Sequence, residues 1–393
     1  MRQPLIAVAG GGVGGVTAAR LLASKLREHG ESARVVLVTD KDRHYIPPLF
    51  LDVAIGEVSP GKTWIPLDRY SRRHGVEVIV DPIVRIDAAE RRLRLASGRA
   101  LDYDYLVVSL GSTMEWSRYP GLAEAGVHNY SLEGALEMRR ALAALKDGST
   151  VLVLVPEIPY RCGIYPVEIT TILAEKFRSE GRRINIKILS PGPAPMPGLG
   201  PDLQSMIKEA FDSYGIEYVE HKGLEEVDAG RRLVRASNVE ERFDLLIKVP
   251  PPGLPEPLRN SEGFTLESDP RWAPAKAPLF RHPKHSEVYM IGEHSMPPTG
   301  LSLAGTFIHS AAMVATAAIL DEIIGFAPVH SLPPTVCAGY LGRGGFMGVC
   351  EPSYNPETGK YKWKKKCYKS LVGPLVALFK LGFYRLWLNM LVG

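Results

Sequence analysis

The chain alternates between short apolar runs and longer amphipathic segments over most of its length. Leu5–Ala9 is apolar at every position, which is typical of a parallel strand buried on both faces. Residues 17–26 have helical composition, and the order of strand and helix then recurs along the chain. The pattern therefore predicts an α/β fold. Further strands are expected at 34–39, 76–80, 105–111, 151–155, 184–189, 216–219, 243–249 and 288–293, and helices at 132–145, 203–214 and 305–324.

The repeated pattern predicts two Rossmann-like domains of the dinucleotide-binding type. A chain of 393 residues is too long for one ordinary hydrophobic core. We expect a discontinuous first domain at 1–115 and 272–330, and a second domain at 116–271. The remaining region, 331–393, is expected to hold a hairpin with a redox cysteine and membrane-associated helices.

A glycine-rich turn separates the first strand from the first helix. Gly10, Gly12 and Gly15 have the Gly-x-Gly-x-x-Gly spacing, and Asp40 ends the next strand. In this context the glycines permit a tight turn, close approach of a pyrophosphate and close packing of helix on strand, while the acid accepts hydrogen bonds from a ribose. The N–H groups at the helix N-terminus attract phosphate. The sequence therefore predicts a bound dinucleotide at this turn.

The second strand of the same type, 151–155, is followed by a different turn. Residues 156–168 include three prolines and Cys162 in place of a second glycine motif. Prolines remove N–H donors that a pyrophosphate would need. The topology repeats without the phosphate cradle, so we expect no tightly bound nicotinamide cofactor.

Composition and charge exclude several classes of function. The net charge of +4 is too small to indicate nucleic-acid binding. The first apolar run leads directly into the glycine turn, which excludes a signal peptide. Four cysteines are too few for a disulfide scaffold in a chain of this length, so they are interpreted as individual chemical groups.

The C-terminal region changes in character. Residues 335–340 and 343–350 predict a hairpin, and six lysines between 360 and 369 form a basic cluster with interleaved aromatic residues. The tail from 371 to 392 is strongly apolar but is divided by Pro374 and Gly382. We expect two short helices in a membrane interface, with Trp363 and Trp387 at the level of the lipid headgroups. An apolar arm for a homo-oligomer is the alternative, and a peripheral protein of the cell membrane is the favoured localisation.

The chain resembles the sulfide:quinone oxidoreductases and the related flavocytochrome c sulfide dehydrogenases. The resemblance covers nearly the whole chain, and its most specific part is Pro-Tyr-Arg-Cys at 159–162 followed by Pro166 and Glu168. It implies FAD in the first domain, hydrogen sulfide as the donor and a membrane quinone as the acceptor. On this resemblance, FAD would be bound by Gly10, Gly12, Gly15, Asp40, Ile83, Ser109, Gly111, Gly292, Glu293 and Gly305.

The resemblance also implies a pair of redox cysteines. Cys337 would face the flavin and Cys162 would carry sulfane sulfur, with polysulfide as a product. A thiol must ionise to attack, and we expect the neighbouring Arg161 to lower the pKa of Cys162. Glu168 could take the protons released by hydrogen sulfide, although an acid in the first turn of a helix is also common without a catalytic role. Cys350 could replace Cys337 or form a resting disulfide with it, and Cys367 is assigned no role.

Three departures from the family pattern leave alternatives open. Residues 127–131 lack a third cysteine that many members have, and Ser302 and Leu303 replace a proline and a lysine near the quinone. Glu293 stands in place of the usual aspartate. A type II NADH:quinone dehydrogenase shares the expected fold but requires the second glycine turn. A non-catalytic FAD-binding protein that senses sulfur at the membrane is the other alternative.

Overall fold

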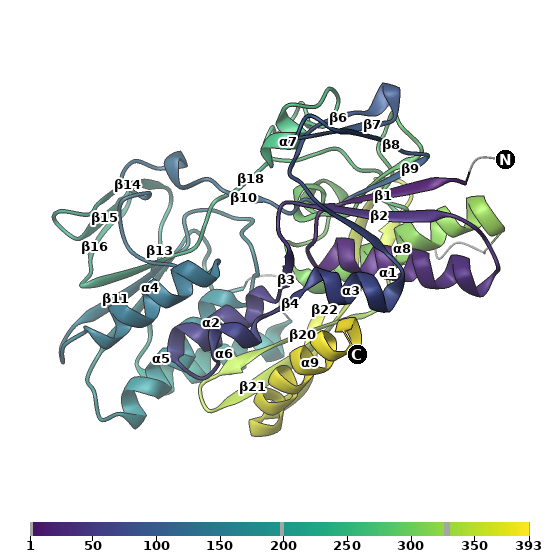
Figure 1. Ribbon diagram of the computed structural model, residues 1–393. Coiled ribbons are helices and arrows are strands. Elements are labelled where there is room, and N and C mark those ends of the chain that lie inside the picture. Colours follow the sequence, from purple (N-terminus) through teal and green to yellow (C-terminus); the bar gives the residue numbers. More distant parts are fainter. Residues whose placement is uncertain (1–2, 197–199, 326–330, 393) are drawn as a thin grey trace.

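The computed structural model describes residues 3–196, 200–325 and 331–392. Figure 1 shows two α/β lobes side by side, with the C-terminal strands and the last helix lying below and between them. The chain passes from the first lobe to the second and back, so the strand at 288–290 joins the sheet that begins at residue 5.

The first lobe is built on a five-stranded parallel sheet. Its strand order is β19-β9-β1-β2-β5, and all five positions of β1 are buried because both faces of the sheet are covered. Three helices cover one face, and a small antiparallel sheet with α7 covers the other (Figure 1). The bounds are β1 (Leu5–Ala9), β2 (Arg34–Thr39), β5 (Glu77–Val80), β9 (Tyr105–Val108), β19 (Val288–Met290), α1 (Val13–Glu28), α3 (Leu67–His74), α8 (Gly305–Ile324), β6 (Ile83–Asp87), β7 (Arg92–Leu95), β8 (Ala100–Asp102) and α7 (Glu256–Arg259).

The second lobe repeats this plan with a four-stranded parallel sheet. The strand order is β13-β12-β11-β17, with helices on one face and a three-stranded antiparallel sheet on the other. A short antiparallel pair, β10 with β18, lies where the chain crosses between the lobes. The bounds are β11 (Thr150–Leu154), β12 (Asn185–Ser190), β13 (Glu217–Glu220), β17 (Leu245–Lys248), α4 (Leu132–Ala143), α5 (Tyr165–Ser179), α6 (Pro201–Tyr214), β14 (Leu224–Asp228), β15 (Leu233–Ala236), β16 (Val239–Arg242), β10 (Thr113–Met114) and β18 (Pro252–Gly253).

The segment after β2 contains a pair of short strands and a short helix. The strands β3 (Arg43–Tyr45) and β4 (Trp64–Pro66) pair with each other, and between them lie a 3-10 turn, Pro47–Leu49, and the short helix α2 (Phe50–Ile55). Proline fits the first positions of a helical turn because its missing N–H would have no partner there. The two prolines therefore begin a helix instead of preventing one.

The C-terminal region confirms the predicted hairpin and corrects the predicted helices. β20 (Thr335–Leu341) pairs antiparallel with β21 (Gly344–Asn355), and the lysine-rich stretch forms a third strand, β22 (Lys360–Gly373). The apolar tail forms one helix, α9 (Pro374–Val392), and not two. Pro374 stands at its first position, where proline is tolerated, and Gly382 stays within the helix on its exposed side.

The predicted helix at 305–324 forms with those bounds as α8. Within the described ranges, it is the one helix long and apolar enough to cross a membrane, and 67% of its most apolar window is buried inside the protein. It packs against α1 and β20.

Candidate active site

The glycine turn between β1 and α1, called the first turn below, has the geometry that a dinucleotide requires. Gly10 has φ of +109°, and a Cβ placed there would lie 2.3 Å from the carbonyl oxygen of Ser109. A Cβ at Gly15 would lie 1.8 Å from the carbonyl oxygen of Gly10. Neither position can hold a side chain, because the strand and the helix approach too closely. The tight turn and the close packing predicted for these two glycines are therefore present.

Gly12 differs from both, because a Cβ there would meet no atom within 4 Å. It is the N-cap of α1, and no side chain caps the helix at this end. The space in front of Gly12 and the N–H groups of the first helical turn fit a pyrophosphate. Asp40 lies exposed directly after β2, next to this turn in the sheet, and is free to face a ribose hydroxyl. The residues present therefore fit FAD.

The other residues assigned to FAD divide into two groups. Gly111 and Gly292 follow the adjacent strands β9 and β19, and a Cβ at Gly292 would lie 3.1 Å from the amide nitrogen of Gly111. Ser109 borders Gly10, and Gly305 begins α8 beside the N-terminus of α1, so these residues surround the first turn. Ile83 begins β6, and its side chain packs in the apolar cluster on the opposite face of the sheet.

Glu293 links the first lobe to the turn between β11 and α5, which holds Cys162 and is called the second turn below. Its Oε2 accepts hydrogen bonds from Ser112 Oγ at 2.6 Å and from Arg161 Nε at 2.8 Å. Arg161 Nη2 also donates to the hydroxyl of Ser112. The guanidinium of Arg161 is therefore occupied by Glu293 and Ser112. The expectation that it lowers the pKa of the Cys162 thiol is wrong.

Cys162 occupies the second turn in an unusual backbone conformation. Its φ is +58°, in the left-handed region, and its N–H donates to the carbonyl oxygen of Leu303 at 2.8 Å. Its carbonyl oxygen accepts from the N–H of Tyr165 at 2.9 Å, one turn before Glu168 on α5. A left-handed non-glycine residue costs about 1 kcal/mol, and such positions gather at functional sites.

The structure brings Cys162 and Cys337 to the same place. Both are free cysteines, and both keep part of their surface accessible. Cys337 is on β20, two residues before Gly339, so the two positions share one face of the strand. A Cβ at Gly339 would lie 3.1 Å from Glu168 Oε1, which shows that this face is turned toward α5 and Glu168.

The thiols are poor acids in this environment. Desolvation raises the pKa of Cys337 to about 12 and raises the pKa of Cys162 further above its ordinary value. The charge of Glu168 raises both pKa values, and the charge of Lys380 lowers both. Electrostatic influence of Cys337 on Cys162 agrees with their proximity. Thiolate formation therefore depends on Glu168 and Lys380.

Glu168 is part of a buried polar network and does not merely stabilise the start of α5. Its Oε1 accepts a hydrogen bond from the N–H of Tyr340 at 2.8 Å and pairs with the ammonium of Lys380. The side chains of Glu168 and Lys380 are only 5% and 4% exposed. The hydroxyl of Tyr340 donates to Asp52 Oδ1 at 2.7 Å, and burial raises the pKa of Asp52. Sequence reasoning missed Asp52, Tyr340 and Lys380; the available signal was a lysine inside an apolar tail.

Cys350 and Cys367 form a disulfide that joins β21 to β22, with 4.1 Å between their Cα atoms. The expected disulfide of Cys350 with Cys337 is therefore wrong, and Cys350 is not placed as a redox partner of Cys162. Cys367, which was assigned no role, holds the other end of this bridge. The two cysteines lie on neighbouring strands of one sheet, which a pattern of spacings does not reveal.

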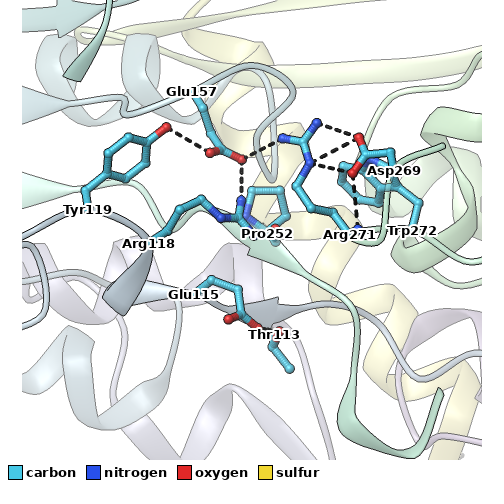
Figure 2. Close-up of polar contacts among 9 residues, drawn as sticks. All are labelled: Thr113, Glu115, Arg118, Tyr119, Glu157, Pro252, Asp269, Arg271 and Trp272. Atoms are coloured by element: carbon cyan, nitrogen blue, oxygen red, sulfur yellow. Dashed lines mark hydrogen bonds and ion pairs between the residues drawn. The ribbon is translucent and has the colours of Figure 1, made fainter. Parts of the chain in front are cut away.

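Glu157, in the second turn, is held by ion pairs and hydrogen bonds. Figure 2 shows Glu157 joined to Arg118, Tyr119 and Arg271. Glu157 Oε1 accepts from Arg118 Nη1 at 2.6 Å and from Arg271 Nη1 at 3.1 Å, while Oε2 accepts from the hydroxyl of Tyr119 at 3.0 Å. Glu157 is the third residue after β11, so this turn offers a carboxylate where a pyrophosphate would need N–H donors.

The last helix touches both turns. Lys380 reaches Glu168, and Trp387 Nε1 lies 3.4 Å from His44 Nε2, while His44 Nδ1 lies 2.9 Å from the carbonyl oxygen of Gly11. Trp387 is 7% exposed, so its predicted place among lipid headgroups is wrong. The outward face of α9 is apolar instead, through Leu375, Leu378, Phe379, Phe383 and Leu386.

Comparison with known proteins supports this picture. The family model described as pyridine nucleotide-disulphide oxidoreductase matches residues 5–248. The chain is 27% identical to the mitochondrial sulfide:quinone oxidoreductase of Dictyostelium discoideum, over 83% of this chain and 72% of that protein. It is also 27% identical to the alternative NAD(P)H-ubiquinone oxidoreductase C1 of Arabidopsis thaliana, over 46% of this chain and 37% of that protein.

A solved structure, the sulfide:quinone oxidoreductase of Aquifex aeolicus, superposes with a TM-score of 0.85 at 18% identity, covering 99% of this chain and 91% of that one. The predicted α/β fold and the resemblance carried by the motifs are thereby confirmed.

Proposed function

This chain belongs to the pyridine nucleotide-disulphide oxidoreductase family of enzymes, and we propose that it oxidises hydrogen sulfide and passes the electrons through FAD to a quinone. The observation that carries the proposal is the pair of accessible free cysteines, Cys162 and Cys337, at the second turn, where a nicotinamide-dependent relative needs a phosphate cradle. The relatives whose names include sulfide and quinone match most of the chain.

The reaction balances as two electrons and two protons. One S–H bond of hydrogen sulfide and the S–H bond of a cysteine break as a sulfur–sulfur bond forms on that cysteine, which releases two electrons and two protons, and the quinone gains two electrons and two protons to become a quinol. FAD, when bound, supplies the two-electron acceptor between them. Cys162 holds the growing sulfane sulfur, Cys337 is its partner, and a polysulfide is the product that leaves. Glu168 accepts a proton that is released when an S–H bond of hydrogen sulfide or of a cysteine breaks.

The remaining residues of the site bind and orient. Gly10, Gly12 and Gly15 would hold the pyrophosphate, and Asp40 the ribose. Arg161 and Glu293 join the second turn to the first lobe through an ion pair at 2.8 Å. We retain the division into 1–115 with 272–330, 116–271 and 331–393 as the proposed domain boundaries.

We also propose that α9 rests on a lipid surface, from which the quinone is drawn. Five large apolar side chains on one face of α9 are exposed, from 46% at Phe383 to 73% at Leu375. The exposed lysines 360, 362 and 364 are on β22, which packs against α9, and suit anionic headgroups. Cosedimentation with vesicles of anionic lipid tests this proposal. Replacing Leu378 and Phe383 by serine should abolish binding, whereas a dimer that persists without lipid and is lost in this variant would support the oligomer arm instead.

The test of the reaction is quinone reduction by the purified flavin-loaded protein, with hydrogen sulfide and NADH as separate donors. We expect turnover with sulfide, and a loss of at least about a thousandfold in kcat/KM in Cys162→Ser and in Cys337→Ser, with the flavin retained. The matched control is the double variant Cys350→Ser/Cys367→Ser, which should keep the activity.

Two results would overturn the proposal. Activity with NADH alone would identify a type II NADH:quinone dehydrogenase, whose nucleotide would then have to bind at the turn that holds Glu157. A flavin-loaded protein inactive with both donors would identify the non-catalytic sulfur-binding alternative.

A further inference from the structure

Lys380 is a buried lysine supplied by the last helix to a site built from distant parts of the chain. Its side chain is 4% exposed, its ammonium pairs with Glu168, and it lies 4.0 Å from the centroid of the Tyr340 ring. A buried ammonium is costly unless it is paired. Glu168 compensates the charge of the Lys380 ammonium while the thiols are protonated. When a thiolate forms, its negative charge also needs a partner.

The charges around the thiols come from several elements. Glu168 and Tyr165 belong to α5, Lys380 and Tyr384 to α9, and Asp52 to α2. Tyr130 and Tyr160 approach Cys162 from the loops before α4 and α5, and Glu293 approaches from the first lobe. The guanidinium of Arg161 is committed to Glu293 and Ser112. Among the described groups whose charge shifts the pKa of both thiols, Lys380 is the cation.

We propose that Lys380 is a positioning residue whose ammonium becomes the counter-ion of a single thiolate, at Cys162 or at Cys337, when Glu168 takes the proton of that thiol. The S–H bond breaks and an O–H bond forms on Glu168, while the ammonium keeps its protons and no electrons move. One anion and one cation are buried before the step, and one anion and one cation after it. The exchange therefore avoids creating an unpaired buried charge.

The network around Glu168 suits this exchange. The N–H of Tyr340 holds Glu168 Oε1 at 2.8 Å in addition to the lysine, so the carboxyl group keeps its place when the ion pair is released. Asp52 is anchored by the hydroxyl of Tyr340, and burial raises its pKa, which favours its neutral form.

The inference deepens the proposed function, but its test needs neither sulfide nor quinone. The alkylation rates of Cys162 and Cys337 by iodoacetamide are measured residue by residue by mass spectrometry, across a pH series, on the reduced holoprotein. Only the thiolate reacts, so the pH profile reports thiolate formation. In Lys380→Met we expect alkylation at neutral pH to slow by at least about tenfold, with the profile moved to higher pH by one unit or more. Arg385→Met is the matched control, because Arg385 is exposed on the same helix.

Lys380→Arg distinguishes charge from packing. It keeps the cation, so its profile should return toward that of the wild type, whereas a merely structural lysine would leave Lys380→Met and Lys380→Arg alike. Glu168→Gln removes the negative charge that raises both thiol pKa values and leaves Lys380 free to pair with a thiolate, so alkylation should be faster and its profile should move to lower pH. An unchanged profile in Lys380→Met, or equal profiles in the two lysine variants with native circular dichroism, overturns the inference. If quinone reduction by sulfide fails while the predicted profiles hold, the proposed function falls and the counter-ion stands.

Discussion

The two parallel sheets place very different turns at equivalent points of their topology. After β1 the chain makes a glycine turn in which two positions exclude any side chain and a third faces open space. After β11 it makes a turn that contains Cys162 in a left-handed conformation and Glu157 in a cluster of ion pairs. The same strand-turn-helix unit thus offers backbone N–H groups at one turn and functional side chains at the other.

The difference shows how one framework offers two kinds of binding surface at equivalent points of its topology. Bare backbone N–H groups at a helix N-terminus suit a phosphate group. A turn that carries a thiol cannot present those N–H groups in the same way, but it can hold a reactive sulfur against the opposite lobe. The second turn is tied directly to the first lobe, because Arg161 pairs with Glu293 at 2.8 Å.

The largest expected effect comes from filling the open space at the first turn. Gly12 has φ of −77° and ψ of −174°, which any residue can adopt, so Gly12→Val should fold normally. Its side chain would stand where a pyrophosphate approaches, and we expect FAD binding to weaken by at least about a hundredfold. Flavin fluorescence titration of the apoprotein measures this affinity. Gly61→Val is the control, since a Cβ at Gly61 also meets no atom within 4 Å, and equal affinities in the two variants would contradict the assignment of the turn.

The next effect concerns the histidine that supports the first turn. Burial lowers the pKa of His44 from 6.5 to about 4, so the folded protein holds it neutral while the unfolded chain takes up a proton near 6.5. The contribution of His44 to the free energy of unfolding is therefore fully present above pH 6.5. It is lost as the pH falls toward 4, because the unfolded chain then binds a proton that the folded protein does not. We expect this residue to account for a loss of about 2 kcal/mol between pH 7 and pH 5.

Urea unfolding at the two pH values isolates this contribution. In His44→Asn the side-chain amide can still donate to the carbonyl oxygen of Gly11, but it does not titrate. The variant should therefore lose less stability on acidification than the wild type. His29→Asn, at an exposed position, should leave the pH dependence unchanged, and an equal dependence in all three proteins would refute the role of His44.

A smaller effect is expected at the ionic cluster of the second turn. Glu157 is 12% exposed and holds two arginines and a tyrosine hydroxyl, so Glu157→Gln removes a largely buried charge from its partners (Figure 2). We expect a loss of about 1–2 kcal/mol in the free energy of unfolding and no gain of NADH oxidation. Glu180→Gln, which breaks an exposed pair with Lys176, should cost about 0.5 kcal/mol or less. NADH oxidation in Glu157→Gln would mean that the cluster alone had blocked a nucleotide site.

The smallest effect tests the strain stored at Cys162. Glycine adopts φ of +58° without penalty, so Cys162→Gly should be about 1 kcal/mol more stable than Cys162→Ala, although both should lack activity with sulfide. The matched control is Cys337, which lies in the regular strand β20, where glycine should be less stable than alanine. Thermal unfolding of the four variants measures the comparison. The same order at both positions would show that the turn is not strained.

Local pattern was sufficient for the first turn and for most of the strands and helices. The glycine spacing, the strand before it and α8 follow from short-range rules of packing and turn formation, and α8 begins and ends where the pattern places it. The hairpin of β20 and β21 was also predicted from neighbouring residues.

The polar network behind the cysteines was not accessible to such rules. Lys380 meets Glu168 across 212 positions of sequence, and Tyr340 meets Asp52 across 288. Inside an apolar helix, Lys380 looks like an interruption until the partner is known. The disulfide likewise depends on the register of β21 against β22, and the pattern of lysines in β22 suggested a surface segment without fixing that register.

The position of Lys380 in the chain has a consequence for the order of events during synthesis. A ribosome releases the N-terminal part of a polypeptide first, so β1, α1 and both cysteines emerge before α9 does. A nascent chain can thus assemble the turn that holds the dinucleotide while its thiols still lack their buried cation. Burial raises the pKa of both thiols as the site folds, and on the counter-ion proposal the cation that favours a thiolate arrives only when α9 docks, so the reactive site is completed by the docking of α9.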